Sequence, residues 1–254
     1  MGFWRGLRTF LAPAPAPERA RLAAAARRLW GRRPRTLIVV AHPDDAEAYF
    51  GAFLLRWLGK GGRAVLAVAT NGEKNCIDPG MGPKDIVKTR QAEQKRAARL
   101  AGVDKVFFLG FPDGKVEEKK FRLVDRLIAL IREVRPAEIW TFDPTCVFMG
   151  PRSFGGPINH PDHRAAGDAA ISAASFGSGL ARFGRRADAK SAGPWPARRL
   201  LLAVPSRPNL RFDPGPYLAR KKRLLELYSS QFDGRAVRRA LAATERSFRR
   251  VRLS

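Results

Sequence analysis

Short apolar runs alternate with longer amphipathic stretches through the middle of the chain. The run at 36–40, Thr-Leu-Ile-Val-Val, is apolar and mostly β-branched, and it is followed by an apolar helical stretch that ends at Gly59. Runs of this length predict buried strands, and the longer stretches predict helices. The predicted strands are 36–40, 63–69, 106–109 and 138–142, and the predicted helices are 47–58, 84–102 and 121–134. This order predicts one α/β domain, Rossmann-like and three-layered, with a mostly parallel sheet.

Each predicted strand ends in a polar loop that carries at least one carboxylate. Asp44 and Asp45 follow the first strand, Glu73 the second, Asp113 the third and Asp143 the fourth. In a parallel sheet these loops meet at the carboxyl edge, where ligands of open α/β sheets bind. We therefore expect these acidic side chains to lie near one another.

All three histidines lie in two short motifs. His42 belongs to Ala-His-Pro-Asp-Asp at 41–45, and His160 and His163 belong to Asn-His-Pro-Asp-His at 159–163. Imidazole nitrogen and carboxylate oxygen suit zinc, and a catalytic zinc takes three protein ligands and one water. An aspartate there can also simply cap a helix. The presence of two such motifs favours metal binding.

Together these residues resemble the PIG-L/LmbE-like zinc-dependent de-N-acetylase family over about residues 36–233. Five family motifs occur in order: A-H-P-D-D-[AE]-E at 41–47, T-R-x-x-E at 89–93, L-G-[YF]-x-D-G at 109–114, H-P-D-H at 160–163 and K-x-x-A-L-x-x-H-x-S-Q at 221–231. The departures from the family pattern include Ala52, which replaces the second glycine of a Gly-Gly pair, and Tyr228, which stands where a histidine is common.

The resemblance implies a zinc-dependent removal of an N-acetyl group. The implied zinc ligands are His42, Asp45 and His163, with Fe²⁺ as an alternative ion. Asp44 would be the general base that takes a proton from water. His160 would stabilise the oxyanion or protonate the leaving amine, and Asp162 would orient His160 and favour its charged form.

The implied substrate is a small N-acetyl amino-sugar conjugate, and a lipid-linked conjugate is one candidate. Arg90 and Asp113 are predicted to bind it, because a guanidinium and a carboxylate suit phosphate or sugar hydroxyls. The alternatives are that Arg90 and Glu93 form a solvated helix pair and that Asp113 only forms a turn. The segments 145–157 and 176–195 match nothing in the family, and we expect them to shape the pocket.

The net charge is +25, from 48 Lys and Arg against 23 Asp and Glu. Residues 1–35 hold nine arginines and one glutamate, and residues 235–254 hold seven arginines and one glutamate. We therefore divide the chain into a basic extension (1–35), a deacetylase domain (36–234) and a basic tail (235–254). The tail is either a second basic helix or a solvated arginine-rich face.

Two other classes of function fit parts of the sequence. The charge suggests binding of nucleic acid or another polyanion, although no motif of a known nucleic-acid module is present. A non-catalytic metal-bound sensor of carbohydrate or lipid could share the fold, but pure binding needs neither Asp44 nor His160. Cys76 and Cys146 form no disulfide framework, which favours a reduced cytoplasmic setting.

The first twelve residues predict a basic amphipathic helix, followed by an Ala-Pro linker. Its apolar stripe is Phe3, Trp4, Leu7, Phe10 and Leu11. No apolar run is long enough to span a membrane, so we expect peripheral contact with an anionic membrane surface.

We predict that the full-length protein co-sediments with anionic vesicles, that salt weakens this binding, and that a shortened protein beginning at Glu18 loses it. Each basic residue near such a surface contributes about 1 kcal/mol, so insertion of the aromatic stripe is also needed. Equal binding by both proteins would contradict the prediction.

Overall fold

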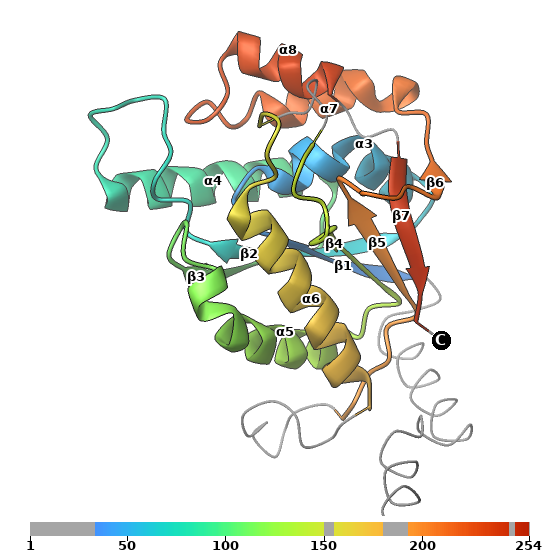
Figure 1. Cartoon of the computed structure of the whole chain (residues 1–254). Coiled ribbons are helices and arrows are strands. Elements are labelled where there is room, and N and C mark those ends of the chain that lie inside the picture. Colours follow the sequence, from blue (N-terminus) through green and yellow to red (C-terminus); the bar gives the residue numbers. More distant parts are fainter. Residues whose placement is uncertain (1–33, 150–154, 180–192, 244–246, 254) are drawn as a thin grey trace, which may run out of the picture.

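The computed structural model describes residues 34–149, 155–179, 193–243 and 247–253. A central sheet has helices on both faces (Figure 1). The strands are β1 Arg35–Val40, β2 Arg63–Thr70, β3 Lys105–Phe111, β4 Glu138–Phe142, β5 Arg199–Ala203, β6 Leu210–Arg211 and β7 Ser247–Arg252. The helices are α3 Asp45–Gly59, α4 Pro83–Ala101, α5 Lys120–Val134, α6 Pro161–Gly179, α7 Leu218–Leu225 and α8 Gly234–Ala242, with short 3₁₀ turns η1 Glu117–Lys119 and η2 Gly215–Tyr217.

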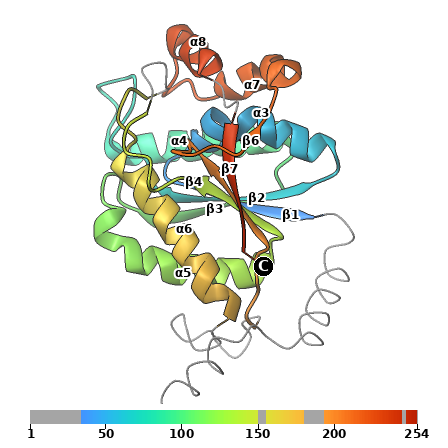
Figure 2. The ribbon, with the colours of Figure 1, turned by 45° about the vertical axis from the view of Figure 1, so that its right-hand side comes forward.

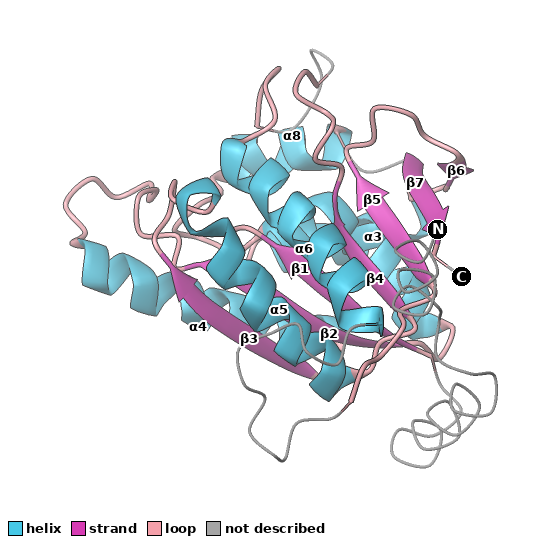
Figure 3. Cartoon of the chain, turned by 60° about the horizontal axis from the view of Figure 1, so that its bottom comes forward, coloured by secondary structure: helices cyan, strands magenta, loops and turns pink. Residues whose placement is uncertain are grey.

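The seven strands lie in the order β3-β2-β1-β4-β5-β7-β6 (Figure 3). The first five of these are mutually parallel, whereas β7 runs antiparallel to both β5 and β6. The predicted α/β fold with a mostly parallel sheet is therefore confirmed. All four strands and all three helices predicted from periodicity are present, with ends shifted by only a few residues.

Side chains of β1 alternate between two hydrophobic layers. Leu37 and Val39 belong to the hydrophobic cluster that includes residues of α5 and α6, whereas Ile38 and Val40 belong to the cluster that includes residues of α3 and α8. Figure 2 shows α5 and α6 on one side of the sheet and α3, α4, α7 and α8 on the other. Because both faces are covered, a central parallel strand is apolar throughout rather than alternating. This is why the run at 36–40 carries no polar face.

The direction of strand order reverses at β1, and this reversal positions the site. From β1 the chain moves outward to β2 and β3 on one side, and later strands β4 and β5 lie on the other. The loops after β1 and β4 therefore leave the same edge side by side, which is the usual ligand crevice of an open α/β sheet. The two His-Asp motifs follow these two strands.

The segment set apart as a basic tail is not separate from the domain. Residues 234–242 form the helix that was one of its two interpretations, but residues 247–252 form β7 and complete the sheet. Phe248 is fully buried and stacks against Phe50, with ring centroids 5.8 Å apart. The apolar residues of β7, Phe248 and Val251, are three positions apart with arginines between them, so the segment lacks the alternation typical of a strand.

The predicted membrane-contacting stripe at 1–12 and the Ala-Pro linker lie outside the described residues. Parts of the two unmatched segments, 150–154 and 180–192, lie outside them as well. Within the described ranges, no helix combines the length and apolar character that crossing a membrane requires.

Candidate metal centre

The turn that leaves β1 fixes the Asp45 carboxylate. Its Oδ2 accepts hydrogen bonds from the backbone N–H groups of Ala41 (3.1 Å) and His42 (2.8 Å). Asp45 also begins α3, and only 3% of its surface is exposed. Burial alone would raise the pKa of this carboxyl, but the neighbouring His163 and His42 lower it well below its usual range. An anionic group is therefore held rigidly at the carboxyl edge of the sheet.

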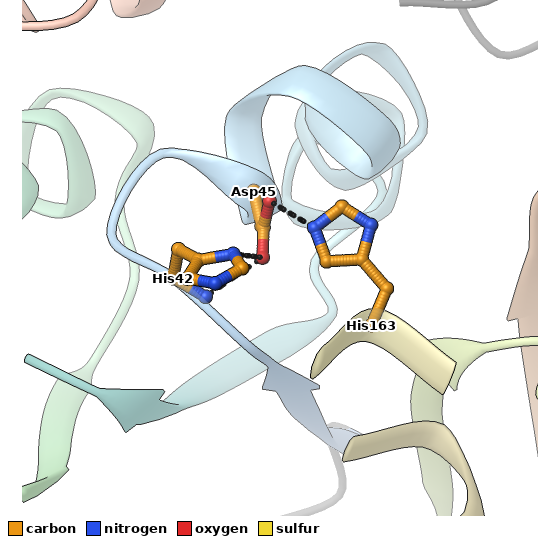
Figure 4. Close-up of side chains that lie close together, drawn as sticks. All are labelled: His42, Asp45 and His163. Atoms are coloured by element: carbon orange, nitrogen blue, oxygen red, sulfur yellow. Dashed lines mark hydrogen bonds and ion pairs between the residues drawn. The ribbon is translucent and has the colours of Figure 1, made fainter. Parts of the chain in front are cut away.

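His163 reaches the same carboxylate from the first turn of α6 (Figure 4). Its Nε2 lies 3.1 Å from Asp45 Oδ1, and its Nδ1 lies 3.2 Å from the Asn159 side-chain oxygen. The ring also stacks flat on Phe142, with centroids 4.2 Å apart and an interplanar angle of 3°. One nitrogen and one ring face are thus occupied by the protein, and the other nitrogen points to Asp45.

His42 is held in the same manner. Its Nδ1 lies 3.4 Å from Asp45 Oδ2, and its Nε2 lies 3.3 Å from Asp113 Oδ1 and 3.4 Å from Asp162 Oδ2. In metal sites, a histidine that binds through one nitrogen usually donates the other N–H to a carboxylate or carbonyl. Both histidines follow this pattern, because their outer nitrogens have such partners and their inner nitrogens face Asp45.

The donor set fits a divalent ion. His42, Asp45 and His163 are all buried, and each offers a ligand atom within 4.8 Å of the others. Two imidazoles and one carboxylate are a combination that zinc and Fe²⁺ both accept. A second set that meets the same distance limit contains His42, His160 and Asp162. The two sets share His42, so they are alternatives rather than separate sites.

The Asp44 carboxylate is paired with Arg90. The Arg90 Nη2 lies 3.0 Å from Asp44 Oδ2 and donates to the Pro43 carbonyl (2.7 Å), while Nη1 donates to the Gly72 carbonyl (2.7 Å). Burial raises the pKa of Asp44 to about 7, and the positive charge of Arg90 opposes that rise. Arg90 is only 3% exposed, so it is not part of a solvated helix pair.

A chain of buried hydrogen bonds holds the backbone of Asp44. Asp44 N–H donates to Gln94 Oε1 (3.1 Å), and Gln94 Nε2 donates to Glu47 Oε1 (3.1 Å). Tyr228 then donates its hydroxyl to Glu47 Oε2 (2.6 Å). Asp44 itself has φ of 104°, in the left-handed region that non-glycine residues rarely occupy. The chain therefore stabilises an unusual backbone conformation at the predicted base.

The Asp162 carboxylate contacts His42 rather than His160, the predicted partner. Its carboxylate accepts from Gly114 N–H (2.6 Å) and Val116 N–H (3.2 Å) and faces His42 Nε2. Toward His160 it offers its backbone N–H, which donates to Nδ1 (3.2 Å). The carboxylate therefore orients His42 rather than His160, because the two N–H groups from the loop after β3 draw it that way.

His160 is the exposed histidine of the cluster. Its ring lies edge-on to that of His42, with centroids 4.9 Å apart. Desolvation by the surrounding protein and the charges of His42 and His163 lower the pKa of His160. Asp162 favours the charged form, as predicted, but it is outweighed.

Asp113 does more than form a turn. Its Oδ1 faces His42, its Oδ2 accepts from Lys74 N–H (3.3 Å), and its own N–H donates to Glu73 Oε1 (2.9 Å). Contact of Asp113 and Arg90 with substrate stays a prediction. The structure gives each of them a further role in holding a site residue, His42 in one case and Asp44 in the other.

Four residues of the site were not predicted as site residues: Asn159, Glu47, Gln94 and Tyr228. Asn159 is the one with a sequence signal, since it precedes His163 by four residues, about one helical turn. The Glu47–Tyr228 pair is separated by 181 residues, and no local pattern connects its members. Glu93 is also buried, and its carboxylate accepts from the backbone and side chain of Ser230.

Comparison with known proteins gives one family and a set of deacetylases. The family model described as GlcNAc-PI de-N-acetylase (PIG-L) matches residues 37–174, more than half of the chain. Diacetylchitobiose deacetylase of Thermococcus kodakarensis is 27% identical over 198 residues, which cover 78% of this chain and 70% of the relative. The 1D-myo-inositol 2-acetamido-2-deoxy-alpha-D-glucopyranoside deacetylase of Kineococcus radiotolerans is 28% identical, covering 68% of this chain and 53% of the relative.

Among solved structures, N,N'-diacetylchitobiose deacetylase from Pyrococcus horikoshii is similar with a TM-score of 0.72. The two chains are 20% identical, and the match covers 89% of this chain and 84% of the other. At this identity the likeness concerns the fold.

We predict that Tyr228→Phe destabilises the protein by about 1–3 kcal/mol, because it leaves the buried Glu47 carboxylate short of one donor. Urea unfolding followed by circular dichroism would measure the change. Tyr217→Phe, at a half-buried tyrosine of η2, is the matched control and should shift the free energy of unfolding by less than about 0.5 kcal/mol. Equal shifts in the two variants would contradict the prediction.

Proposed function

Because the chain belongs to the PIG-L family of de-N-acetylases, we propose that it is a metal-dependent hydrolase that removes the N-acetyl group from an N-acetylglucosaminyl conjugate. The observation that carries this proposal is the buried set of His42, Asp45 and His163, flanked by the Asp44 carboxylate and the exposed His160. The relatives named as deacetylases of diacetylchitobiose and of a 2-acetamido-2-deoxyglucopyranoside support the same substrate class.

Zinc is the proposed ion, with Fe²⁺ as an alternative that the same ligands accept. Asp45 supplies the negative charge, and the two imidazoles are held with one nitrogen each toward it. When bound, such an ion lowers the pKa of a water and polarises a carbonyl oxygen. A bound ion would also compensate the negative charge of the buried Asp45 carboxylate, whose other partners are His42 and His163.

Asp44 and His160 carry out the two proton transfers of amide hydrolysis. Asp44 takes a proton from the water while the water oxygen forms a bond to the acetamide carbonyl carbon. His160 delivers a proton to the nitrogen as the C–N bond breaks, which yields acetate and a free amine. Arg90 limits the movement of the Asp44 carboxylate, and the Gln94 side chain limits that of its backbone. Precise placement of a base matters because misplacement by about 1 Å can cost about 100-fold in rate.

We predict that His163→Ala loses most of the bound zinc while keeping its fold, because one of three ligands is removed. Zinc content after dialysis, measured by plasma mass spectrometry, gives the result, and circular dichroism monitors the fold. His160→Ala is the matched control and should retain zinc. The opposite outcome, with zinc lost from His160→Ala and kept in His163→Ala, would favour the set of His42, His160 and Asp162.

We predict that Asp44→Asn retains zinc and fold but loses about 100-fold or more of its deacetylase activity, since an amide cannot accept the proton of water. Acetate release from N-acetylglucosaminyl substrates is the measurement. Asp168→Asn, at an aspartate of α6 that pairs with Lys120, is the control and should keep full activity. Near-normal turnover by Asp44→Asn would exclude Asp44 as the base.

A further inference from the structure

The chain between β4 and α6 doubles back on itself beside the metal centre. Phe148 and Ile158 form an antiparallel bridge, and two backbone hydrogen bonds of 2.7 and 2.9 Å flank it. Residues 147–149 and 157–159 therefore make a short two-stranded ladder. This ladder leads directly into His160 and the first turn of α6.

The faces of the ladder are set by its register. Side chains directly opposite in an antiparallel pair share a face, and successive residues alternate between faces. Asn159 points inward, because its buried side chain donates to the Cys146 carbonyl (2.9 Å) and meets His163. Ile158 and its partner Phe148 therefore point outward, and their side chains are 58% and 80% exposed.

His160 follows Ile158 by two residues and lies on the exposed side of the site. The three residues that can hold the metal are buried, whereas His160 is exposed and its ring faces His42 at 4.9 Å. A substrate that places its acetamide at the buried set therefore extends outward past His160. Ile158 is two residues from His160 along the chain and Phe148 is its bridge partner, so both lie near His160.

Apart from Asn159, which points inward, the ladder is apolar, in a chain in which 28% of residues are charged. Its members Val147, Phe148 and Met149 on one side and Pro157 and Ile158 on the other carry no polar side chain. Single exposed apolar residues are ordinary on protein surfaces. A cross-strand pair beside a catalytic centre is instead the kind of patch that marks a ligand-binding surface.

We infer that Phe148 and Ile158 form a subsite for an apolar aglycone, an alkyl or aryl group carried by the glucosamine conjugate. The inference rests on the proposed deacetylase function and specifies its substrate class. The sugar would lie at the metal centre, and the apolar group would cover the two side chains. Burial of apolar surface on both partners then favours such conjugates over the free sugar.

The test compares the octyl and methyl glycosides of N-acetylglucosamine as substrates of the zinc-loaded protein, below the micelle concentration of the octyl glycoside. Wild-type kcat/KM should be about tenfold or more higher for the octyl glycoside. Phe148→Ala and Ile158→Ala should each reduce the octyl-to-methyl ratio severalfold. Phe121→Ala, at a phenylalanine of α5 that is 84% exposed, is the matched control and should leave the ratio unchanged.

Two outcomes of this comparison would overturn the subsite. One is a wild-type ratio near one, and the other is a ratio that survives both alanine substitutions. A substitution that merely disturbed His160 would lower the rates on both glycosides together and leave the ratio intact, so that result also counts against the subsite.

Binding separates failure of the subsite from failure of the proposed function. If neither glycoside is hydrolysed, the deacetylase proposal fails, and the subsite is then judged by titration of octyl glucoside followed by NMR. Binding that Phe148→Ala weakens and Phe121→Ala does not would support the subsite, and no binding would overturn it. Loss of a dimer or of vesicle binding in Phe148→Ala, without loss of octyl glucoside binding, would assign the surface to a second copy or to a membrane.

Discussion

The candidate site depends on one buried carboxylate, that of Asp45. Two backbone N–H groups hold one of its oxygens, and His163 faces the other across a distance of 3.1 Å. A buried anion needs a compensating positive charge, which protonated histidines or a divalent ion can supply. The Asp45 carboxylate therefore connects the turn after β1 to the start of α6. These two segments follow strands on either side of the point where the strand order reverses.

The neighbouring residue shows how much support one functional side chain requires. Asp44 has a left-handed backbone, a conformation that costs about 1–3 kcal/mol in a non-glycine residue. Gln94 and Arg90 from α4 hold its N–H and its carboxylate, and Tyr228 from the loop after α7 reaches it through Glu47 and Gln94. Residues of α4 and of the loop after α7 thus support the proposed base.

Charge is distributed unevenly between the site and the surface. The carboxylates of Asp45, Asp113 and Asp162 surround His42, so the centre is acidic although the chain carries a net charge of +25. An acidic centre suits a divalent cation and a neutral amide substrate. Among the described residues, exposed arginines lie on α8 and β7.

The sequence alone determined the features that depend on short segments. Periodicity located β1 to β4 and three helices, because the strands are short apolar runs and an amphipathic helix repeats every three to four residues. The two His-Asp motifs indicated a metal site, and the family resemblance, rather than their spacing, selected His42, Asp45 and His163 from them. Periodicity missed β7, because its apolar residues Phe248 and Val251 do not alternate with polar ones and arginines fill the positions between them.

Only the tertiary structure decided which partner each side chain takes. Asp162 orients His42 rather than the adjacent His160, because N–H groups from a loop 46 to 48 residues earlier in the chain draw its carboxylate. Tyr228 and Glu47 meet across 181 residues, and Asp113 reaches His42 from another strand. Such pairs depend on how the strands are ordered in the sheet. Local patterning specifies each element and its buried face, but it does not specify which loops then face one another.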